Sequence, residues 1–360
     1  MNDTLVVSQQ SPWWNKDRIS RLLPNLRERN QTMATIRRWF EDRQFIEVET
    51  PTLQISPGLE PHLLAFKTSL REPFDECDHP LYLQTSPEYA MKKLLVGGLE
   101  QIFQFAKCFR NGERSKIHHP EFTMLEWYRV NENWRRVAGD TESLIRLAAT
   151  SLGVREFRLE DRICYPQKPF EYLSVIEAFR SFAQIDLRPT LTDPLQPDRV
   201  LFAHMARDIG VRVLDEDSWD VIFDRILLEK IEPNLGIGSG VVLHDYPLPL
   251  AALARQSIND PCLSERFEVY LCGVELANGF GELIDFSEQS ERFKADLSKR
   301  HSLGKELYPV DQDFLAALES GMPDASGAAM GFDRLMMFLS SAASLEEVVL
   351  SPVLNRTHER

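Results

Sequence analysis

The hydrophobic pattern becomes regular at residues 31–43, where apolar residues recur at helical spacing and arginines occupy the opposite side. This stretch predicts an amphipathic helix. The segment "FIEVETP" follows it, alternates as a strand does, and ends at Pro51. Residues 1–30 are polar and contain two prolines, which favours an extended arm. We therefore predict an N-terminal arm over 1–30 and one folded domain over 31–360.

The pattern continues with a short strand, a turn at Ser86-Pro87 and a helix that ends at Gly97-Gly98, all within "LYLQTSPEYAMKKLLVGG". The segments "QIFQFAKCFR" and "EFTMLEWYRV" predict a hairpin with a long connection, whereas residues 52–80 look rich in loops. Further helices are predicted at 140–152, 174–184, 217–231, 287–300 and 311–320.

Two glycine-containing segments near the C-terminus predict the remaining strands. "RFEVYLCGVELANGFGEL" is typical of a strand pair or a bulged strand, and "SGAAMGFDRLMMFL" of a strand that runs into an apolar helix. Regular helices do not separate the predicted strands. We therefore expect an α+β fold built on a mainly antiparallel sheet.

Composition narrows the class of protein. The chain has 360 residues, with 55 acidic against 41 basic side chains and a net charge of -14, which argues against non-specific binding to nucleic acid. Its five cysteines are scattered and form no CxxC pair, as expected for reduced thiols. The N-terminus lacks the pattern of a signal peptide, and no apolar run approaches a membrane span. We expect a cytoplasmic protein with no membrane partner.

The second strand of the predicted hairpin carries an unusual face. Because side chains alternate along a strand, Phe122, Met124, Glu126 and Tyr128 share one side. A buried carboxylate costs several kcal/mol (roughly) unless it is paired. Glu126 therefore either pairs with Arg110 at the end of the facing strand or receives a cation from a ligand, and this stretch alone leaves both readings open.

Two later segments favour a ligand site. In "GVELANGFGEL", Glu275 precedes Asn278, Phe280 and Glu282, which lie two apart on one face. In "MGFDRL", Arg334 stands where a glycine-containing strand becomes a helix, a position that suits phosphate because a guanidinium is always charged and can bind bidentately. A solvated arginine is the competing reading of that single residue.

His118-His119 has no accompanying metal-ligand spacing. The pair is either exposed or in contact with a nucleotide.

Three segments together resemble the signature motifs of class II aminoacyl-tRNA synthetases, in order and over roughly 31–355. They are "FIEVETPTL", "FRNGERSKIHHPEFTMLEWY" and "GAAMGFDRL". Within that class, "TSPEYAMKKLL", "HPEFTMLEWY" and "ELANGFGEL" resemble the lysyl-tRNA synthetase branch. Only about 30 residues precede the helix of the first segment, fewer than the N-terminal barrel of the lysyl enzymes requires. The chain is therefore most similar to the stand-alone family of elongation factor P–(R)-β-lysine ligases.

The resemblance implies an ATP site with Mg²⁺. It assigns nucleotide binding to Arg110, Asn111, Gly112, His119, Phe122, Glu275, Leu276, Gly331 and Arg334. Of these, Arg110 would hold the α-phosphate, Arg334 would clamp the γ-phosphate, and Glu275 would be the Mg²⁺ ligand, so these three are the expected catalytic residues.

The resemblance also implies a pocket for β-lysine, whose two ammonium groups need carboxylates. It assigns the pocket to Ser86, Pro87, Glu88, Glu126, Tyr128, Asn278 and Glu282. The amino acid would be activated as an adenylate and transferred to a lysine ε-amine of elongation factor P, the expected protein partner. The first motif, around Pro51, would form a homodimer interface.

The chain departs from the family pattern at several positions. Gly112 stands where relatives usually have Glu, His119 where Asn is usual, and Gly281 where a bulkier polar residue is common. Ala329 replaces the middle glycine of the third motif. We hypothesise that its methyl group disfavours α-lysine relative to a β-amino acid.

Three other functions compete with this interpretation. The first is a minimal lysyl-tRNA synthetase, which the acidic balance disfavours. The second is a small-molecule ligase such as an asparagine synthetase of the same fold. The third is a catalytically silent, synthetase-like regulator, which the retention of Arg110, Glu275 and Arg334 disfavours.

Overall fold

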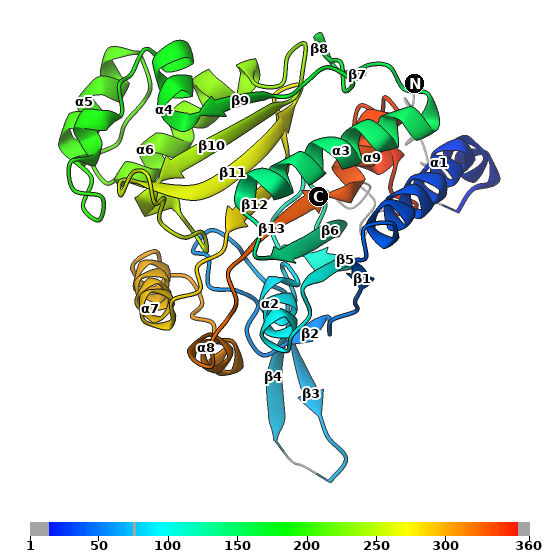
Figure 1. Cartoon of the computed structure of the whole chain (residues 1–360), viewed down its shortest axis with the longest axis horizontal. Helices are drawn as coiled ribbons and strands as arrows, with labels where there is room; N and C mark the ends of the chain where they lie inside the picture. Colours follow the sequence, from blue (N-terminus) through cyan, green and yellow to red (C-terminus); the bar gives the residue numbers. More distant parts are fainter. Residues whose placement is uncertain (1–13, 75–76, 352–360) are drawn as a thin grey trace, which may run out of the picture.

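The computed structural model describes residues 14–74 and 77–351, and within them a large mixed sheet forms the centre of the molecule (Figure 1). The strand order is β1-β5-β6-β13-β12-β11-β10-β9. The strands are β1 Ile46–Glu47, β5 Gln101–Phe109, β6 Glu121–Val130, β9 Glu171–Ser174, β10 Val241–Pro247, β11 Leu263–Leu271, β12 Val274–Gly281 and β13 Ala325–Gly331.

The pairing is antiparallel except at the two ends of this sheet, where β1 pairs with β5 and β9 pairs with β10 in parallel. The mainly antiparallel α+β fold expected from the sequence is confirmed. The predicted hairpin β5–β6 and the predicted strand pair β11–β12 are both present.

Three helices cover one face of the sheet: α1 Lys16–Glu41, α3 Trp134–Leu152 and α9 Phe332–Leu339 (Figure 1). Leu125 and Trp127, the residues that alternate with Glu126, are fully buried beneath them. Phe40 of α1 stacks on Phe103 of β5 with ring centroids 4.3 Å apart. The apolar side of β6 therefore packs in the main core, and its unusual side faces the opposite surface of the sheet.

Two groups of helices flank that opposite surface. The first is α2 Glu88–Val96, α7 Phe286–Ser302 and α8 Gln312–Glu319, and the second is α4 Val175–Ala178, α5 Arg199–Asp208 and α6 Trp219–Ile226. Each group has its own apolar cluster. Residues of α2, α6 and α7 line one cavity over the sheet.

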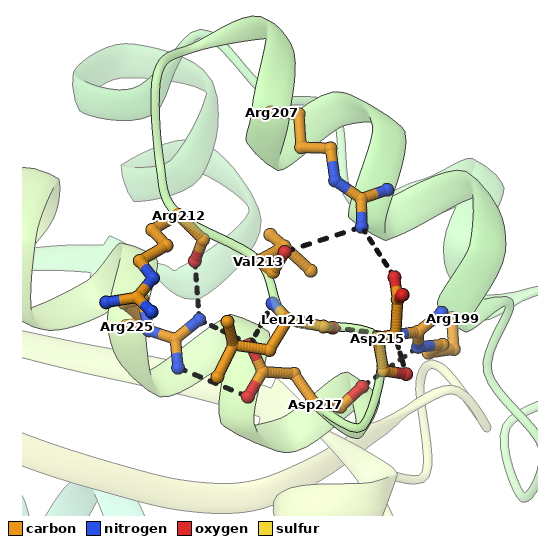
Figure 2. A network of polar contacts seen from close by, with 8 residues as sticks. All are labelled: Arg199, Arg207, Arg212, Val213, Leu214, Asp215, Asp217 and Arg225. Carbon is orange, nitrogen blue, oxygen red and sulfur yellow. Dashed lines mark hydrogen bonds and ion pairs between the residues drawn. The ribbon is translucent and has the colours of Figure 1, made fainter.

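The loop that precedes α6 is held by arginines (Figure 2). Arg199 donates to the carbonyl oxygens of Leu214, Asp215 and Asp217, and Arg225 pairs with the Asp217 carboxylate at 2.5 Å. These contacts, together with the burial of Val211 in the apolar cluster, fix the start of α6.

The N-terminal prediction needs correction. The first helix starts at Lys16, with Asn15 Oδ1 accepting a hydrogen bond from the Asp17 amide, so residues 16–30 are helical. Pro24 lies inside this helix, and reading it as a helix breaker was wrong. The rest of the predicted arm, residues 1–13, lies outside the described residues.

The region 52–80 was also misjudged. It contains a second sheet, in the order β2-β4-β3, whose β3–β4 hairpin extends away from the body of the molecule (Figure 1). Its strands are β2 Leu53–Gln54, β3 Lys67–Arg71 and β4 Asp78–Leu83. All five residues of β3 are exposed, so the strand lacks the alternation that would reveal it.

The remaining elements are short. They are β7 Phe157–Leu159, β8 Arg162–Cys164, η1 Phe179–Ala183, η2 Arg188–Leu191, η3 Leu227–Ile231, η4 Glu232–Asn234, η5 Leu248–Leu250 and η6 Leu345–Glu347. None of the helices in 14–74 and 77–351 combines the length and the apolar character needed to cross a bilayer.

Candidate functional site

A cavity of about 520 Å³ lies over the open face of the sheet. It unites most of the residues predicted to form the site, which come from segments far apart in the sequence. These lining residues are Ser86, Glu88, Arg110, His119, Phe122, Glu126, Tyr128, Glu275, Leu276, Asn278, Glu282, Gly331 and Arg334.

Three predicted site residues are not part of the cavity wall: Pro87, Asn111 and Gly112. Pro87 occupies the N-cap position of α2. The Asn111 amide donates to the Leu64 carbonyl at 2.7 Å, and Gly112 has a φ of +81°. Asn111 and Gly112 thus form a turn in which glycine is needed for its backbone conformation. This accounts for Gly112 without any contact to a nucleotide.

A β-bulge explains how Glu275 and Asn278 share the cavity although they lie three residues apart. Tyr270 of β11 pairs with Glu275, and the preceding residue of that strand, Val269, pairs with Ala277. Leu276 is therefore the extra residue of the bulge. Without this shift, the two-residue period would place Glu275 on the opposite side from Asn278.

Glycines on the reverse side of β12 permit close packing. A Cβ atom at Gly279 would collide with the Phe267 ring and lie 2.7 Å from the Gly327 carbonyl oxygen. A Cβ at Gly281 would collide with the Glu265 carboxylate. A bulkier residue at Gly281 would require the Glu265 side chain, which pairs with Arg255, to move.

One end of the cavity contains three carboxylates, Glu88, Glu126 and Glu282, which we call the acidic subsite. Glu126 is 1% exposed and accepts hydrogen bonds from Ser86 Oγ at 2.8 Å and from the Tyr128 hydroxyl at 2.6 Å. Among the described residues it forms no ion pair with Arg110, so the salt-bridge reading of Glu126 is wrong. Burial, reinforced by Glu88, raises the pKa of Glu126 to about 8.

A buried lysine forms ion pairs with the other two carboxylates. Lys92 Nζ lies 2.5 Å from Glu88 Oε1 and 2.5 Å from Glu282 Oε2. Burial raises the pKa of Glu282 to about 7 against the opposing effect of Lys92. The expectation that all three carboxylates await the substrate alone therefore needs correction. The signal for Lys92 in the sequence was its position four residues after Glu88 on a helix.

The other end of the cavity, which we call the nucleotide end, contains Arg110, Phe122, Glu275 and Arg334. The Arg110 guanidinium lies 5.3 Å from the centre of the Phe122 ring, and its Nε is 3.4 Å from the Thr85 carbonyl oxygen. In the described residues Arg110 makes no ion pair, so its charge is available for an anion.

Arg334 is held at three points. It donates to the carbonyl oxygens of Ile117 at 3.1 Å and Glu275 at 2.7 Å, and one terminal nitrogen lies 2.8 Å from His118 Nε2. Burial, together with Arg334, lowers the pKa of His118, which favours a neutral ring that can accept from the guanidinium. Our reading of His118 as an exposed residue or a nucleotide contact missed this role. The solvated reading of Arg334 is wrong.

Asp333 links the three motif regions. Its carboxylate accepts from Arg29 of α1 at 2.6 Å and from the Thr123 amide of β6 at 2.7 Å. Arg29 also donates to Thr123 Oγ1 at 2.8 Å. The adjacent Arg334 thus projects into the cavity from a helix whose first turn is tied to the other two motif regions.

Glu268 was not recognised from the sequence and lines the same cavity as Glu275. It accepts from the hydroxyls of Tyr246 at 2.6 Å and Tyr270 at 2.5 Å, and pairs with Arg266 at 2.6 Å. Burial and then the charge of Glu268 raise the pKa of Glu275, against the opposing effect of Arg334, whose Nη1 lies 3.8 Å from the Glu275 carboxylate.

Within 14–74 and 77–351 no three or more His, Cys, Asp or Glu side chains form a metal cluster. Mg²⁺ at nucleotide sites is usually held by one or two carboxylates together with phosphate oxygens. Glu268 and Glu275 therefore fit a magnesium ion that arrives with ATP.

A second acidic region lines the same cavity. It consists of Glu60, Asp224 of α6 and Asp296 of α7, and the Asp220–Lys299 ion pair joins α6 to α7 beside it. Burial raises the pKa of Glu60 to about 7, and those of Asp224 and Asp296 to about 6. This region adds negative charge to a cavity that also contains Arg110 and Arg334.

Comparison with protein families identifies the fold and its chemistry. The family model described as tRNA synthetases class II (D, K and N) matches residues 10–355. This match spans the β5–β6 hairpin, β12 and the β13–α9 junction, which together carry the nucleotide end, and α1, whose Arg29 contacts Asp333. The chain belongs to the class II tRNA synthetase (D, K and N) family, whose catalytic domains bind ATP with Mg²⁺ and carry out ATP-dependent, aminoacylation-type chemistry.

Proposed function

We propose that this protein activates a lysine-type diamino acid, (R)-β-lysine, with ATP and transfers it to a lysine ε-amine of elongation factor P. The observation that carries the proposal is the acidic subsite. Three carboxylates share one internal cation, Lys92, so the subsite has two negative charges without a counter-ion when all three are ionised. An amino acid with two ammonium groups supplies that charge.

The nucleotide end accounts for the first half of the reaction. The substrate carboxylate attacks the α-phosphorus of ATP, an aminoacyl-adenylate forms, and pyrophosphate leaves. Arg110 beside Phe122 is placed to stabilise charge that develops on the α-phosphate, and the ring of Phe122 offers a face for adenine. Magnesium bound through Glu268 and Glu275 would add positive charge at the phosphates. The cavity positions the reactants, and no nucleophilic side chain is required.

The second half of the reaction needs an amine acceptor. A lysine ε-amine attacks the carbonyl carbon of the adenylate, an amide bond forms, AMP leaves, and the amine releases its proton. The second acidic region, formed by Glu60, Asp224 and Asp296, offers carboxylates to the ammonium group of an acceptor lysine. This favours a protein acceptor over tRNA, as the net charge of -14 also does.

The β-amino preference rests on Ala329. Ala329 pairs with Glu126 on one side and with Asn278 on the other, and it lines the cavity. Its methyl group thus lies on the cavity floor next to the acidic subsite, where glycine would leave more space for an α-amino group.

We also propose that the protein is a homodimer. Ile46, Leu53 and Ile55, in and just after the first motif, are 52%, 48% and 61% exposed. Ile46 belongs to β1, the strand at one end of the large sheet, and Leu53 belongs to β2 of the second sheet. Apolar side chains left exposed on strands are candidates for an association surface. Light scattering should give twice the chain mass, and the monomer mass would remove this part of the proposal.

The acceptor experiment tests the function. Purified protein, ATP and either (R)-β-lysine or α-lysine are incubated with elongation factor P or with tRNA. Mass spectrometry should show one added β-lysine on the factor, dependent on ATP, with little charging of tRNA. Charging of tRNA without modification of the factor would favour a minimal lysyl-tRNA synthetase. Activation of asparagine or aspartate would favour a small-molecule ligase, and absence of any adenylate would favour a silent regulator.

A further inference from the structure

Lys92 is a buried lysine that forms ion pairs with two carboxylates of the acidic subsite. Its side chain is 1% exposed, it lies on α2, and it does not line the cavity. It lies behind Glu88 and Glu282, whose carboxylates face the cavity, and reaches both at 2.5 Å. A lysine at this depth is rare unless it is paired, and here it has two anionic partners from different elements.

The charged groups around Lys92 can be counted one by one. Glu88 comes from the same helix, Glu282 follows β12, and Glu126 on β6 feels the charge of Lys92 without contacting it. Arg255 also acts on Glu282 but is paired with Glu265 and Asp324. Tyr128 is neutral, because burial and then Glu126 raise its pKa well above the usual value. Lys92 is therefore the internal cation of the subsite among the described residues.

We propose that Lys92 is a positioning residue that sets the charge of the acidic subsite at minus two once its three carboxylates are ionised, which is the form that accepts an amino acid with two ammonium groups. This rests on the proposed function. Burial alone lowers the pKa of Lys92, but Glu282 and Glu88 outweigh it and keep the group charged. Without Lys92, three carboxylates crowd one another, and like charges at this distance retain protons.

The proposal predicts a specific change in Lys92→Met. The carboxylates keep protons that the diamino acid must displace, so kcat/KM for the diamino acid in ATP–pyrophosphate exchange at pH 7 falls at least about tenfold. The activity recovers as pH rises, which moves the midpoint of the pH profile upward by about one unit, equal to that tenfold change. Lys92→Arg keeps the charge and the wild-type midpoint.

The double variant Lys92→Met/Glu88→Gln separates charge from packing. It removes a buried pair together, which proteins tolerate better than removal of one partner, and it leaves two carboxylates in the subsite. Its pH midpoint should return toward that of the wild type. If Lys92→Met lowers activity while its midpoint stays in place, Lys92 is merely structural and the inference is wrong.

Unliganded protein gives a readout that does not depend on the reaction. Carboxyl groups that hold extra protons in the folded state destabilise it as pH rises. The melting temperature of Lys92→Met should therefore fall more steeply between pH 6 and 9 than that of the wild type, and equal slopes would overturn the inference. If the wild type activates no diamino acid, the proposed function fails, whereas these slopes still decide the role of Lys92. If Lys92→Met does not fold, the double variant is compared with Glu88→Gln in the same way.

Discussion

Glu126→Gln isolates the contribution of one carboxylate to the acidic subsite. Glutamine has nearly the same shape but cannot ionise: its carbonyl oxygen can accept from one of the hydroxyls of Ser86 and Tyr128, and its NH2 group can donate to the other. In the wild type the pKa of Glu126 is about 8, so at pH 7 this group is mostly protonated before the amino acid binds. A dicationic ligand requires the ionised form.

The magnitude follows from that pKa. Each pH unit below it costs about 1.4 kcal/mol, or tenfold in affinity. Counting Glu126 alone, the affinity of the wild type for the diamino acid should rise about fiftyfold from pH 6 to pH 8 and then level off. Binding at pH 7 should release about 0.9 proton from this group.

The assay is isothermal titration of the diamino acid at several pH values in buffers with different ionisation enthalpies. In Glu126→Gln the steep rise of affinity with pH should disappear, and only the weaker pH dependence that comes from Glu282 should remain. The affinity of this variant for the diamino acid at pH 8 should be roughly thirtyfold or more below that of the wild type. Glu121→Gln, on the same strand but outside the cavity wall, is the matched control. Should Glu126→Gln retain the wild-type slope, the assignment of Glu126 to the substrate is refuted.

Three further expectations follow from the same contacts. Gly279→Ala should lower the free energy of unfolding by about 1–3 kcal/mol, because its Cβ would meet the Phe267 ring and the Gly327 carbonyl oxygen. Gly139→Ala on α3 is the control and should cause no such loss, because its Cβ would meet no other atom. Equal melting temperatures for the two variants would contradict the packing described. Ala329→Gly should raise kcat/KM for α-lysine relative to (R)-β-lysine in pyrophosphate exchange, and an unchanged ratio would remove Ala329 from the specificity argument. The unliganded protein should melt at a lower temperature at pH 8 than at pH 6, because Glu126, Glu282 and Glu60 have raised pKa values and bind protons more tightly in the folded state. A saturating concentration of the diamino acid should reduce this difference in melting temperature. Equal melting temperatures at the two pH values without ligand would argue against buried, uncompensated carboxylates.

Strand periodicity was sufficient to predict the two faces of β6. Glu126 and Tyr128 face the cavity, while Leu125 and Trp127 lie in the core, because a two-residue period and burial on one side leave no other register. The convergence of Arg110, Asn278 and Arg334 also followed from motifs whose residue types suit one chemistry.

The features that were missed depend on contacts between distant segments. Lys92 acquires its role from Glu282, 190 positions away in the chain, and Glu268 from the tyrosines of two strands. The bulge at Leu276 is visible only once β11 and β12 are paired. Pro24 was overinterpreted because local propensity treats proline as a breaker, whereas in α1 tertiary packing maintains the helix across it.

Amino-acid dependence of ATP–pyrophosphate exchange tests the central claim most directly. The acidic subsite predicts exchange with (R)-β-lysine or α-lysine at a kcat/KM at least about a hundredfold above that with norleucine, which has the same chain but one ammonium group. Comparable exchange with norleucine, or exchange with aspartate in place of the diamino acids, would contradict it.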